Sequence, residues 1–329
     1  MTVPAEWAPH AAMWVGFPSH LDLWEEHLEE AREETAGLCR ALADVGAEQV
    51  KLLACGADAT SAAAELLRGT RGIDIIDTVF GDIWLRDTGP IFTAEAEAVA
   101  FAFNGWGGKY RFAGDDGIAE TIARRARARL SRAGFVLEGG ALDHDGEGTA
   151  LATRQCLLNP NRNRGWNEQR AEAALAEALA VRKILWLDQG LLNDHTDGHV
   201  DNLARFLAPG IVACPMAFGP DDPNQHAYDR AAAALAMTTD AAGRALRVVR
   251  VPSPGRQIDE QHRSLPASHM NFLIANGAVI VPTYEDFAAR LAREALAGEF
   301  PGRRVIGLPA RALLSGGGAF HCISQQQPA

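Results

Sequence analysis

Helix-like and strand-like segments alternate along the whole 329-residue chain, and this alternation restricts the fold more than any other feature. Apolar residues at helical spacing predict helices at about 22–45, 118–133, 167–181, 225–242 and 285–298, with a shorter one at about 58–68. Apolar runs rich in β-branched residues predict strands between them. These runs are QVKLLACG, GIDIIDTVFGD, VAFAFNGW, GFVLEGG, KILWLDQG, GIVACP, LRVVRVP, NGAVIVPTY and RRVIGLPA. The order predicts an α/β fold, and because no Ser/Gly-rich or charged linker divides the chain, we expect one domain over residues 1–329.

Net charge and cysteine content limit the partners of the chain. The sequence has 42 acidic and 31 basic residues and a formal net charge of -11, which opposes attraction to nucleic acid or to an anionic membrane surface and favours a cationic small molecule. Five cysteines without close pairs are typical of reduced thiols in the cytoplasm. We expect neither export nor membrane insertion, because no signal sequence and no apolar run of about eighteen residues is found.

The C-terminal segment LSGGGAFHCISQQQPA is dense in groups that can take part in chemistry. Three consecutive glycines, Gly316–Gly318, allow a ligand to approach the backbone, and His321, Cys322 and Ser324 follow directly. Cys322 is therefore either a nucleophile or a small apolar residue of a buried strand. We interpret the other four cysteines as structural, because they lie in apolar helix or strand patterns.

Residues 193–206, NDHTDGHVDNLARF, bring histidines and aspartates close together in the sequence. If the second half of this segment is extended, His199 and Asp201 lie on the same face. Two functions then compete: a metal site of His195, His199 and Asp201, or an acid–base histidine beside a carboxylate that holds a cationic substrate. A solvated loop with capping aspartates is the third interpretation. Gly198 disfavours the helix that zinc ligands four positions apart would need.

Two further acidic residues follow strand-like runs. In FGDIWLRDTGPIF, Trp84 precedes Asp87 by three positions, and an indole beside a carboxylate can stack on a guanidinium and accept its hydrogen bonds. An ion pair between Arg86 and Asp87 in an ordinary turn is the alternative. In LEGG, Glu138 precedes two glycines. Together with a thiol and a His-x-Asp, these residues are what attack of sulfur on a guanidinium carbon requires: groups that hold the cation, attack it and protonate the leaving nitrogen.

Six motifs, in this order, resemble the agmatine deiminase and bacterial-type peptidylarginine deiminase family of the guanidine-modifying, or pentein, superfamily. They are PAEWAPHAAMWVGFPS, WLRDTGPIF, FNGWGGKY, LEGG, TDGHVDNLARF and GGGAFHCISQQQP, and they extend over essentially the whole chain. The resemblance implies an α/β propeller, in which five ββαβ modules surround a pseudo-fivefold axis and the active site lies at the centre.

The same resemblance implies a role for each matching residue, and it implies neither a cofactor nor a metal ion. The expected catalytic residues are Cys322 as the nucleophile, His199 as the general acid and base, Glu138 as an acidic partner of His199, and Asp87 and Asp201 as the carboxylates that hold the guanidinium. Trp84 and Trp106 are expected to line the substrate site beside these two aspartates.

The substrate is the open part of this interpretation. Agmatine, giving N-carbamoylputrescine and ammonia, is the first expectation; free or C-terminal peptidyl arginine is the alternative, and a non-catalytic sensor of a cationic metabolite is another. Ala319, where the family usually has asparagine, and His195, in an HTDG stretch, depart from the family pattern. An arginine substrate would need a cation for its carboxylate. Arg154, Arg162 and Arg164 are candidates, although their setting favours surface residues on a loop. Self-association into a homo-oligomer stays open.

Overall fold

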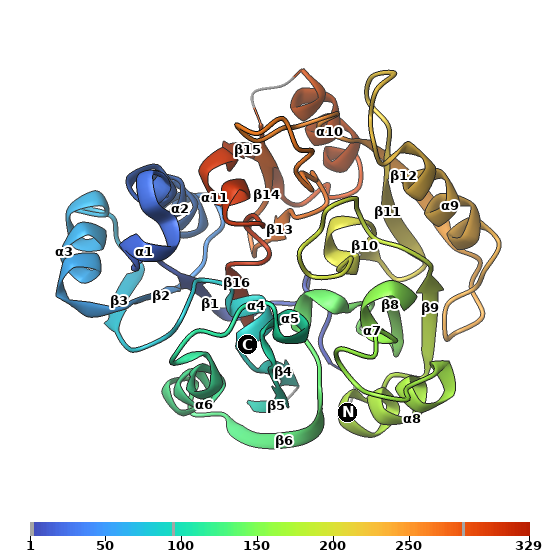
Figure 1. Cartoon of the computed structure of the whole chain (residues 1–329), viewed down its shortest axis with the longest axis horizontal. Helices are drawn as coiled ribbons and strands as arrows, with labels where there is room; N and C mark the ends of the chain where they lie inside the picture. The colour runs from blue at the N-terminus through green and yellow to red at the C-terminus, as the bar shows by residue number, and fades with distance from the viewer. Residues whose placement is uncertain (1–2, 94–95, 285–286) are drawn as a thin grey trace.

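Five small β-sheets surround a common centre, and the longer helices lie outside them (Figure 1). The structure is a computed structural model that describes residues 3–93, 96–284 and 287–329. Within these ranges one sheet has four strands and the other four sheets have three strands each. This arrangement confirms the α/β class that the alternating pattern predicts.

Four of the sheets repeat one connection. The middle strand pairs antiparallel with the strand before it and parallel with the strand after it, and a helix joins the parallel pair. A parallel pair needs such a crossover, which explains why helices and strands alternate in the sequence. The strands of these four sheets are β4 (Ile91–Thr93), β5 (Glu97–Ala102) and β6 (Arg129–Val136); β7 (Asp143–His144), β8 (Thr149–Thr153) and β9 (Lys183–Leu187); β10 (Arg205–Ala208), β11 (Ile211–Met216) and β12 (Arg247–Pro252); and β13 (Leu273–Ile274), β14 (Ala278–Thr283) and β15 (Arg304–Pro309).

The remaining sheet joins the two ends of the chain. Its order is β16-β1-β2-β3, in which β16 pairs antiparallel with β1 and the other two strands follow in parallel. Val15 lies opposite Ser324 in the first pair, so residues 321–322 lie beside the N-terminal strand. These strands are β1 (His10–Gly16), β2 (Val50–Ala54), β3 (Ile73–Asp77) and β16 (Ser324–Pro328).

Long helices cover the sheets, and short helices carry several polar residues near the centre (Figure 1). The α-helices are α1 (Leu21–Trp24), α2 (Leu28–Asp44), α3 (Gly56–Leu66), α4 (Leu85–Thr88), α5 (Gly105–Gly108), α6 (Asp115–Ala126), α7 (Arg154–Leu157), α8 (Glu168–Leu179), α9 (Gln225–Ala236), α10 (Ala288–Ala297) and α11 (Arg311–Ser315). The 3-10 helices are η1 (Glu25–His27), η2 (Gly139–Ala141) and η3 (Val200–Asn202).

Each predicted helix is present at least in part, but the one predicted at about 22–45 is broken, because Glu25 has a positive φ (47°) and η1 separates α1 from α2. Two further helix ends are also wrong. The helix predicted to reach 133 ends at Ala126, because Arg127 adopts a left-handed conformation (φ 58°) and the following residues pair with β5 as strand β6. The helix predicted to reach 242 ends at Ala236, and Asp240 instead closes a turn by accepting the backbone N–H groups of Ala242 and Arg244. For the last predicted helix, positions 285–286 lie outside the described residues.

The largest apolar cluster packs the N-terminal sheet against α2 and α3 and continues to the centre, where it includes Trp84, Trp106 and Cys322. The nucleophile candidate therefore belongs to a rigid, close-packed region. In the part of the chain that the structure describes, no helix combines the length and apolar character needed to cross a bilayer.

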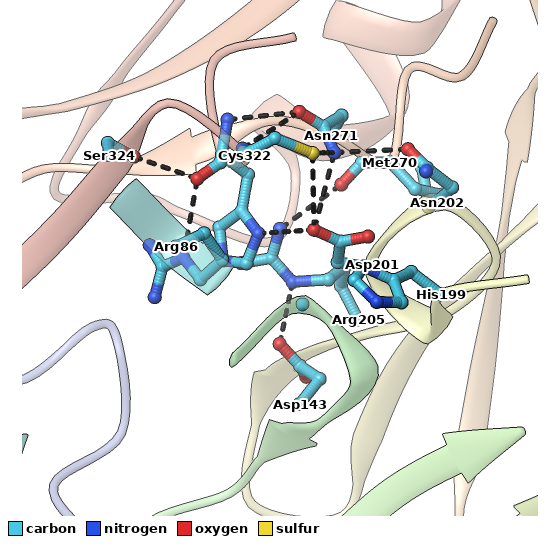
Figure 2. Close-up of polar contacts among 12 residues, drawn as sticks. Arg86, Asp143, His199, Asp201, Asn202, Arg205, Met270, Asn271, Cys322 and Ser324 are labelled. Carbon is cyan, nitrogen blue, oxygen red and sulfur yellow. Dashed lines mark hydrogen bonds and ion pairs between the residues drawn. The ribbon is translucent and has the colours of Figure 1, made fainter. Parts of the chain in front are cut away.

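A buried arginine connects the sheets at this centre. Arg205, at the start of β10, has no exposed surface; its Nε donates to Asp143 Oδ1 at 2.6 Å, and its Nη2 pairs with Glu6 (Figure 2 shows the first contact). Its Nη1 donates to the carbonyl oxygens of Met270 and Phe272, at 3.1 and 2.9 Å. One guanidinium therefore ties together the N-terminal segment, β7, β10 and the residues next to β13.

We expect Arg205→Ala to lower the free energy of unfolding by about 3–5 kcal/mol, because Glu6 and Asp143 would keep buried charges without their cation. Urea unfolding followed by circular dichroism measures the change. Arg129→Ala is the matched control, since Arg129 pairs with Glu97 at an exposed site, where an ion pair contributes about 0–1 kcal/mol. Equal losses in the two variants would contradict a central role for Arg205.

Candidate active site

The thiol of Cys322 lies at the centre of the sheets, between α11 and β16. The residue is 6% exposed, and its sulfur is 3.0 Å from Asn271 Nδ2 and 3.6 Å from Asp201 Oδ2 (Figure 2). A Cβ at Gly318 would lie 2.6 Å from the ring of Trp84 and 3.0 Å from the Cβ of Cys322. The glycine at this position therefore makes room for an indole directly beside the sulfur.

Asp87 and Asp201 reach the centre from α4 and η3. Asp87 is held on both oxygens: Oδ1 accepts from the backbone N–H of Gly140 at 3.0 Å, and Oδ2 accepts from Trp106 Nε1 at 2.9 Å. Asp201 Oδ2 is 2.8 Å from His321 Nδ1. Its Oδ1 is buried and has no hydrogen-bond partner among the described residues, so it is available to a donor from a ligand.

His199 and both aspartates lie against the same glycine, Gly140. A Cβ at Gly140 would lie 2.6 Å from His199 Nδ1, 2.9 Å from Asp87 Oδ1 and 3.1 Å from Asp201 Oδ2. His199 is fully buried, its Nδ1 is 3.8 Å from Asp87 Oδ1, and neither ring nitrogen has a hydrogen bond of standard geometry within the described ranges. Glycine at this position therefore lets the backbone approach the imidazole and both carboxylates closely, since any side chain there would collide with all three groups.

The extended conformation considered for the second half of residues 193–206 is wrong where the site is built. Val200–Asn202 form a 3-10 turn, and strand β10 begins only at Arg205. The turn is fixed from both sides: Thr196 Oγ1 accepts the backbone N–H of His199 at 3.1 Å, and Thr153 donates to the carbonyl of Gly198 at 2.6 Å. His199 and Asp201 share a space because of this turn, and not because of strand alternation.

The two tryptophans have different positions. Trp106, with a left-handed backbone (φ 50°), holds Asp87 through its indole N–H. Trp84 lies against Gly318, donates to Asp82 Oδ2 at 2.8 Å and packs on Trp24 with ring centroids 6.1 Å apart.

The ion pair between Arg86 and Asp87 that the sequence left open is not what the structure shows. Arg86 Nη1 donates to Gln326 Oε1 at 2.7 Å, and its Nε donates to the carbonyl of His321 at 3.3 Å. Arg86 therefore anchors the C-terminal strand, while Asp87 keeps its own partners in the site.

Glu138 is paired with a residue that sequence reasoning placed at the surface. Arg162 is buried, and its Nε donates to Glu138 Oε1 at 2.7 Å while its Nη1 donates to Asp197 Oδ2 at 2.5 Å. The surface assignment of Arg162 is therefore wrong. The surface assignment agrees with the structure for Arg164, which is exposed, and for Arg154, which is partly exposed. The Nε of Arg154 is 2.6 Å from Glu168 Oε1.

One cluster of potential metal ligands occurs in the described part of the chain, and it differs from the set considered from the sequence. One donor atom each from Glu138, Cys156 and His199 lies within 4.8 Å of the others. His195 and Asp201 are not part of it, so the ligand set of His195, His199 and Asp201 is not assembled. Since Arg162 already neutralises Glu138, a metal cation would have to compete with a buried guanidinium for that carboxylate.

Asn271 is the site residue that the sequence analysis missed. It lies in the apolar stretch ASHMNFLIAN, just before β13, and the side-chain amide contacts Cys322 and Asn202 (Figure 2). An asparagine between the apolar residues of MNFLIA was the available signal, since buried polar side chains need partners. Nothing in its local spacing indicates that the partner is a cysteine 51 positions later.

Burial and charge set the protonation of the ligand-free site. Burial and the carboxylates of Asp201 and Asp87 raise the pKa of the Cys322 thiol well above its ordinary value. Burial opposes a charge on His199, but Asp87, Cys156 and Asp201 together hold the pKa of its imidazole well above the ordinary value. These shifts favour a protonated thiol, an imidazolium and an ionised Asp201 in the ligand-free site. A planar cation between the carboxylates would offset their charge at the sulfur and favour the thiolate.

Comparison with known proteins agrees with this geometry. Agmatine deiminase of Pseudomonas syringae pv. tomato is 38% identical to this chain over an alignment of 360 positions, gaps included. The alignment covers 99% of this chain and 95% of the relative. Agmatine deiminase of Enterococcus faecalis has a similar structure, with a TM-score of 0.92 and 31% identity over 99% of this chain and 95% of the other. A cysteine-to-serine variant of the C. jejuni agmatine deiminase, solved with substrate bound, aligns with a TM-score of 0.89 and 27% identity over 100% and 96% of the two chains.

Five small sheets around one centre give this chain the pentein fold of its structural neighbours, which include deiminases and, by fold alone, an amidinotransferase. The sequence profile of the family described as Porphyromonas-type peptidyl-arginine deiminase matches residues 2–328, and the chain belongs to this family. The resemblance stated from the sequence motifs is confirmed, and with it the expected fold.

We expect Cys322 to react with 2-chloroacetamidine at least about tenfold faster at pH 7 than with neutral 2-chloroacetamide, because an amidinium between Asp87 and Asp201 would lower the pKa of the thiol by about one unit or more. Mass spectrometry of the peptide containing Cys322 gives both rates, and the same pair of rates for glutathione corrects for the reagents themselves. The rate with the neutral reagent should still rise above pH 9, since the ligand-free thiol ionises late. Equal corrected rates would show that the site does not favour a cation.

Proposed function

We propose that this protein hydrolyses the guanidinium group of agmatine to N-carbamoylputrescine and ammonia through a covalent intermediate on Cys322. The observation that carries the proposal is the meeting of one thiol, one imidazole and two carboxylates in one buried region: Cys322 Sγ is 3.6 Å from Asp201 Oδ2, and His199, Asp87 and Asp201 all lie against Gly140. Asp201 Oδ1 and both ring nitrogens of His199 have no hydrogen-bond partner among the described residues, so they are available to a bound guanidinium.

The proposed reaction proceeds through two additions to the same carbon. The guanidinium binds between Asp87 and Asp201, the thiol of Cys322 releases its proton to water, and the thiolate adds to the central carbon. The imidazolium of His199 gives a proton to one nitrogen, which leaves as ammonia, and an S-alkylthiouronium remains. Water then adds to this carbon and gives a proton to His199, and the carbon–sulfur bond breaks with its electron pair returning to sulfur. The ureido product loses a proton to ammonia, and the thiolate of Cys322 takes back from water the proton that it released in the first step. The sum is guanidinium plus water giving ureido product plus ammonium.

Charge at the site favours a substrate without a carboxylate. Arg162, the buried cation nearest to Glu138 in the described ranges, is already shared between Glu138 and Asp197, so it is not available for the carboxylate of an arginine substrate. We infer that the ammonium group at the far end of agmatine extends toward a groove that His195 lines in part and that carries more acidic than basic side chains. Its charged lining residues are Glu25, Glu26, Glu30, Glu34, Asp194, Asp259 and Glu260, against Lys109, Arg263 and Arg311. The two deiminase structures and the curated relative compared above carry the name agmatine deiminase.

The same proposal treats residues 1–329 as one domain in the cytoplasm. A single family profile extends over residues 2–328, which supports one domain. All five cysteines are free thiols, which suits a reducing compartment.

The experiment that tests the function offers the purified protein agmatine, free arginine and a peptide ending in arginine, and measures ammonia and ureido product together. We expect kcat/KM for agmatine to exceed the other two values by about 10²-fold or more, because the unpaired carboxylate of an arginine substrate would meet acidic groups. Cys322→Ser should bind agmatine and form no product. A preference for arginine would move the activity to the alternative deiminase, and product formation by Cys322→Ser would remove the covalent mechanism.

We expect His199→Ala to lower kcat for agmatine by about 10²–10⁴-fold with a much smaller change in KM, because proton transfer to the leaving nitrogen would be lost while both aspartates remain. Steady-state ammonia release measures both constants. His226→Ala is the control, since His226 is exposed on helix α9. A kcat for His199→Ala within a few-fold of the unsubstituted enzyme would exclude the assigned role.

A further inference from the structure

The side chain of Asn271 uses every hydrogen-bonding position that it has. Its Oδ1 accepts from the backbone N–H groups of His321 at 3.0 Å and of Cys322 at 3.3 Å. Its Nδ2 is 3.0 Å from Asn202 Oδ1, 3.0 Å from Cys322 Sγ and 3.4 Å from Asp201 Oδ2. An amide nitrogen has two hydrogens, so the two shorter contacts take them and the third is at most shared.

These contacts determine which way the amide points. The backbone N–H groups of His321 and Cys322 can only donate, so the atom that faces them must be the carbonyl oxygen. A flipped amide would place two donors against two donors and would leave Asn202 Oδ1 facing an oxygen. The N–H of Asn271 is therefore directed at the sulfur, which is also how Figure 2 shows it.

The two carboxylates near the sulfur have the opposite effect on a negative charge. Asp201 Oδ2, at 3.6 Å, accepts from the thiol and repels a thiolate, and Asp87 adds to this repulsion. The backbone of Ala319 acts in the same direction as Asn271, since it lowers the pKa of the thiol, and this effect needs no side chain at position 319. In the described part of the chain, Asn271 is the side chain that donates to Cys322 Sγ.

We propose that Asn271 is a further catalytic residue, whose side-chain amide stabilises the negative charge on the sulfur of Cys322 before it attacks the substrate. Its carbonyl oxygen at the same time holds the backbone of Cys322, so one residue positions the nucleophile and supports its charged form. This inference rests on the proposed role of Cys322 as the nucleophile.

The surroundings of Asn271 hold it in this position. Asn202 Oδ1 accepts its second hydrogen, and the backbone of Asn202 is tied to the Asn271 segment because Ser268 Oγ donates to the Asn202 carbonyl at 2.7 Å. Ser268 Oγ also accepts the backbone N–H of Met270 at 3.0 Å. The donor is thus pre-oriented, which is what stabilisation of a charge in a buried site requires.

The test is Asn271→Asp, which has nearly the same shape and can still accept from both backbone N–H groups, but has no N–H for the sulfur. The rate of Cys322 alkylation by iodoacetamide, followed by mass spectrometry of its peptide, is measured from pH 6 to pH 10.5. We expect the rising part of the profile to move about one pH unit or more to higher pH, since hydrogen bonds to charged groups are among the stronger ones in proteins. In the agmatine assay we expect kcat/KM to fall roughly 10-fold or more.

Ser324→Ala is the matched control. It removes the hydrogen bond from Ser324 Oγ to the carbonyl of His321, next to the nucleophile, and this bond involves neither the sulfur nor Asn271. Its alkylation profile should therefore stay within about 0.3 pH unit of the unsubstituted protein. A profile for Asn271→Asp that also stays within this range, or an equal shift in Ser324→Ala, would overturn the proposal by showing that Asn271 acts only through packing.

Thermal unfolding shows whether each variant is folded. If Asn271→Asp does not fold, the pH profile of Cys322 alkylation is measured on Asn271→Ala instead. Failure of both variants to fold would assign Asn271 to stability and overturn the proposal. The alkylation rate does not depend on which guanidine is the substrate. Product formation by Cys322→Ser would therefore refute the proposed function and leave the effect of Asn271 on the sulfur as measured.

Discussion

The rest of the structure depends on a chain of buried charges that begins at Arg205. Its guanidinium binds Glu6 and Asp143, Glu6 Oε2 is 3.2 Å from His321 Nε2, and His321 Nδ1 is 2.8 Å from Asp201. Each carboxylate in this chain is buried, and each would be costly without its partner. This series of buried contacts favours the charged form of Asp201, because His321, His199 and Arg205 together lower the pKa of Asp201 against the effect of burial.

This charge arrangement explains why the centre is suited to a cation. Asp201 is ionised by its partners, while Asp87 has its pKa raised by burial and by the nearby Asp201 and Glu138 despite the opposing effect of His199. Negative charge is thus concentrated beside a sulfur that must itself become negative. A guanidinium relieves both repulsions at once, so binding and activation of the nucleophile are coupled by the same electrostatics.

Much of this site could be predicted from the sequence, because its residues stand out in their own segments. Cys322 follows a run of glycines, His199 and Asp201 form a His-x-Asp, and Asp87 follows a tryptophan at a strand end. Arg162 and Asn271 do not stand out. Arg162 looks like a loop residue until Glu138 is placed beside it, and Asn271 looks like part of an apolar strand until Cys322 is placed beside it. The end of the helix predicted to reach 133 was wrong for a related reason, because the partner of that segment is distant in the sequence. Residues from Arg129 onward pair with β5 as strand β6, and this pairing overrides the helical pattern.

The sequence by itself determined the α/β alternation, the family, and the residue types that meet at the centre, because each of these is written in local spacing and in short motifs. Only the tertiary structure decided which atoms face one another: the unpartnered oxygen of Asp201, the close approach of Gly140 to His199 and both aspartates, and the amide of Asn271 directed at the sulfur. The physical reason is distance along the chain. These contacts join residues tens to hundreds of positions apart, and the packing of five sheets around one centre is what brings them within hydrogen-bond range.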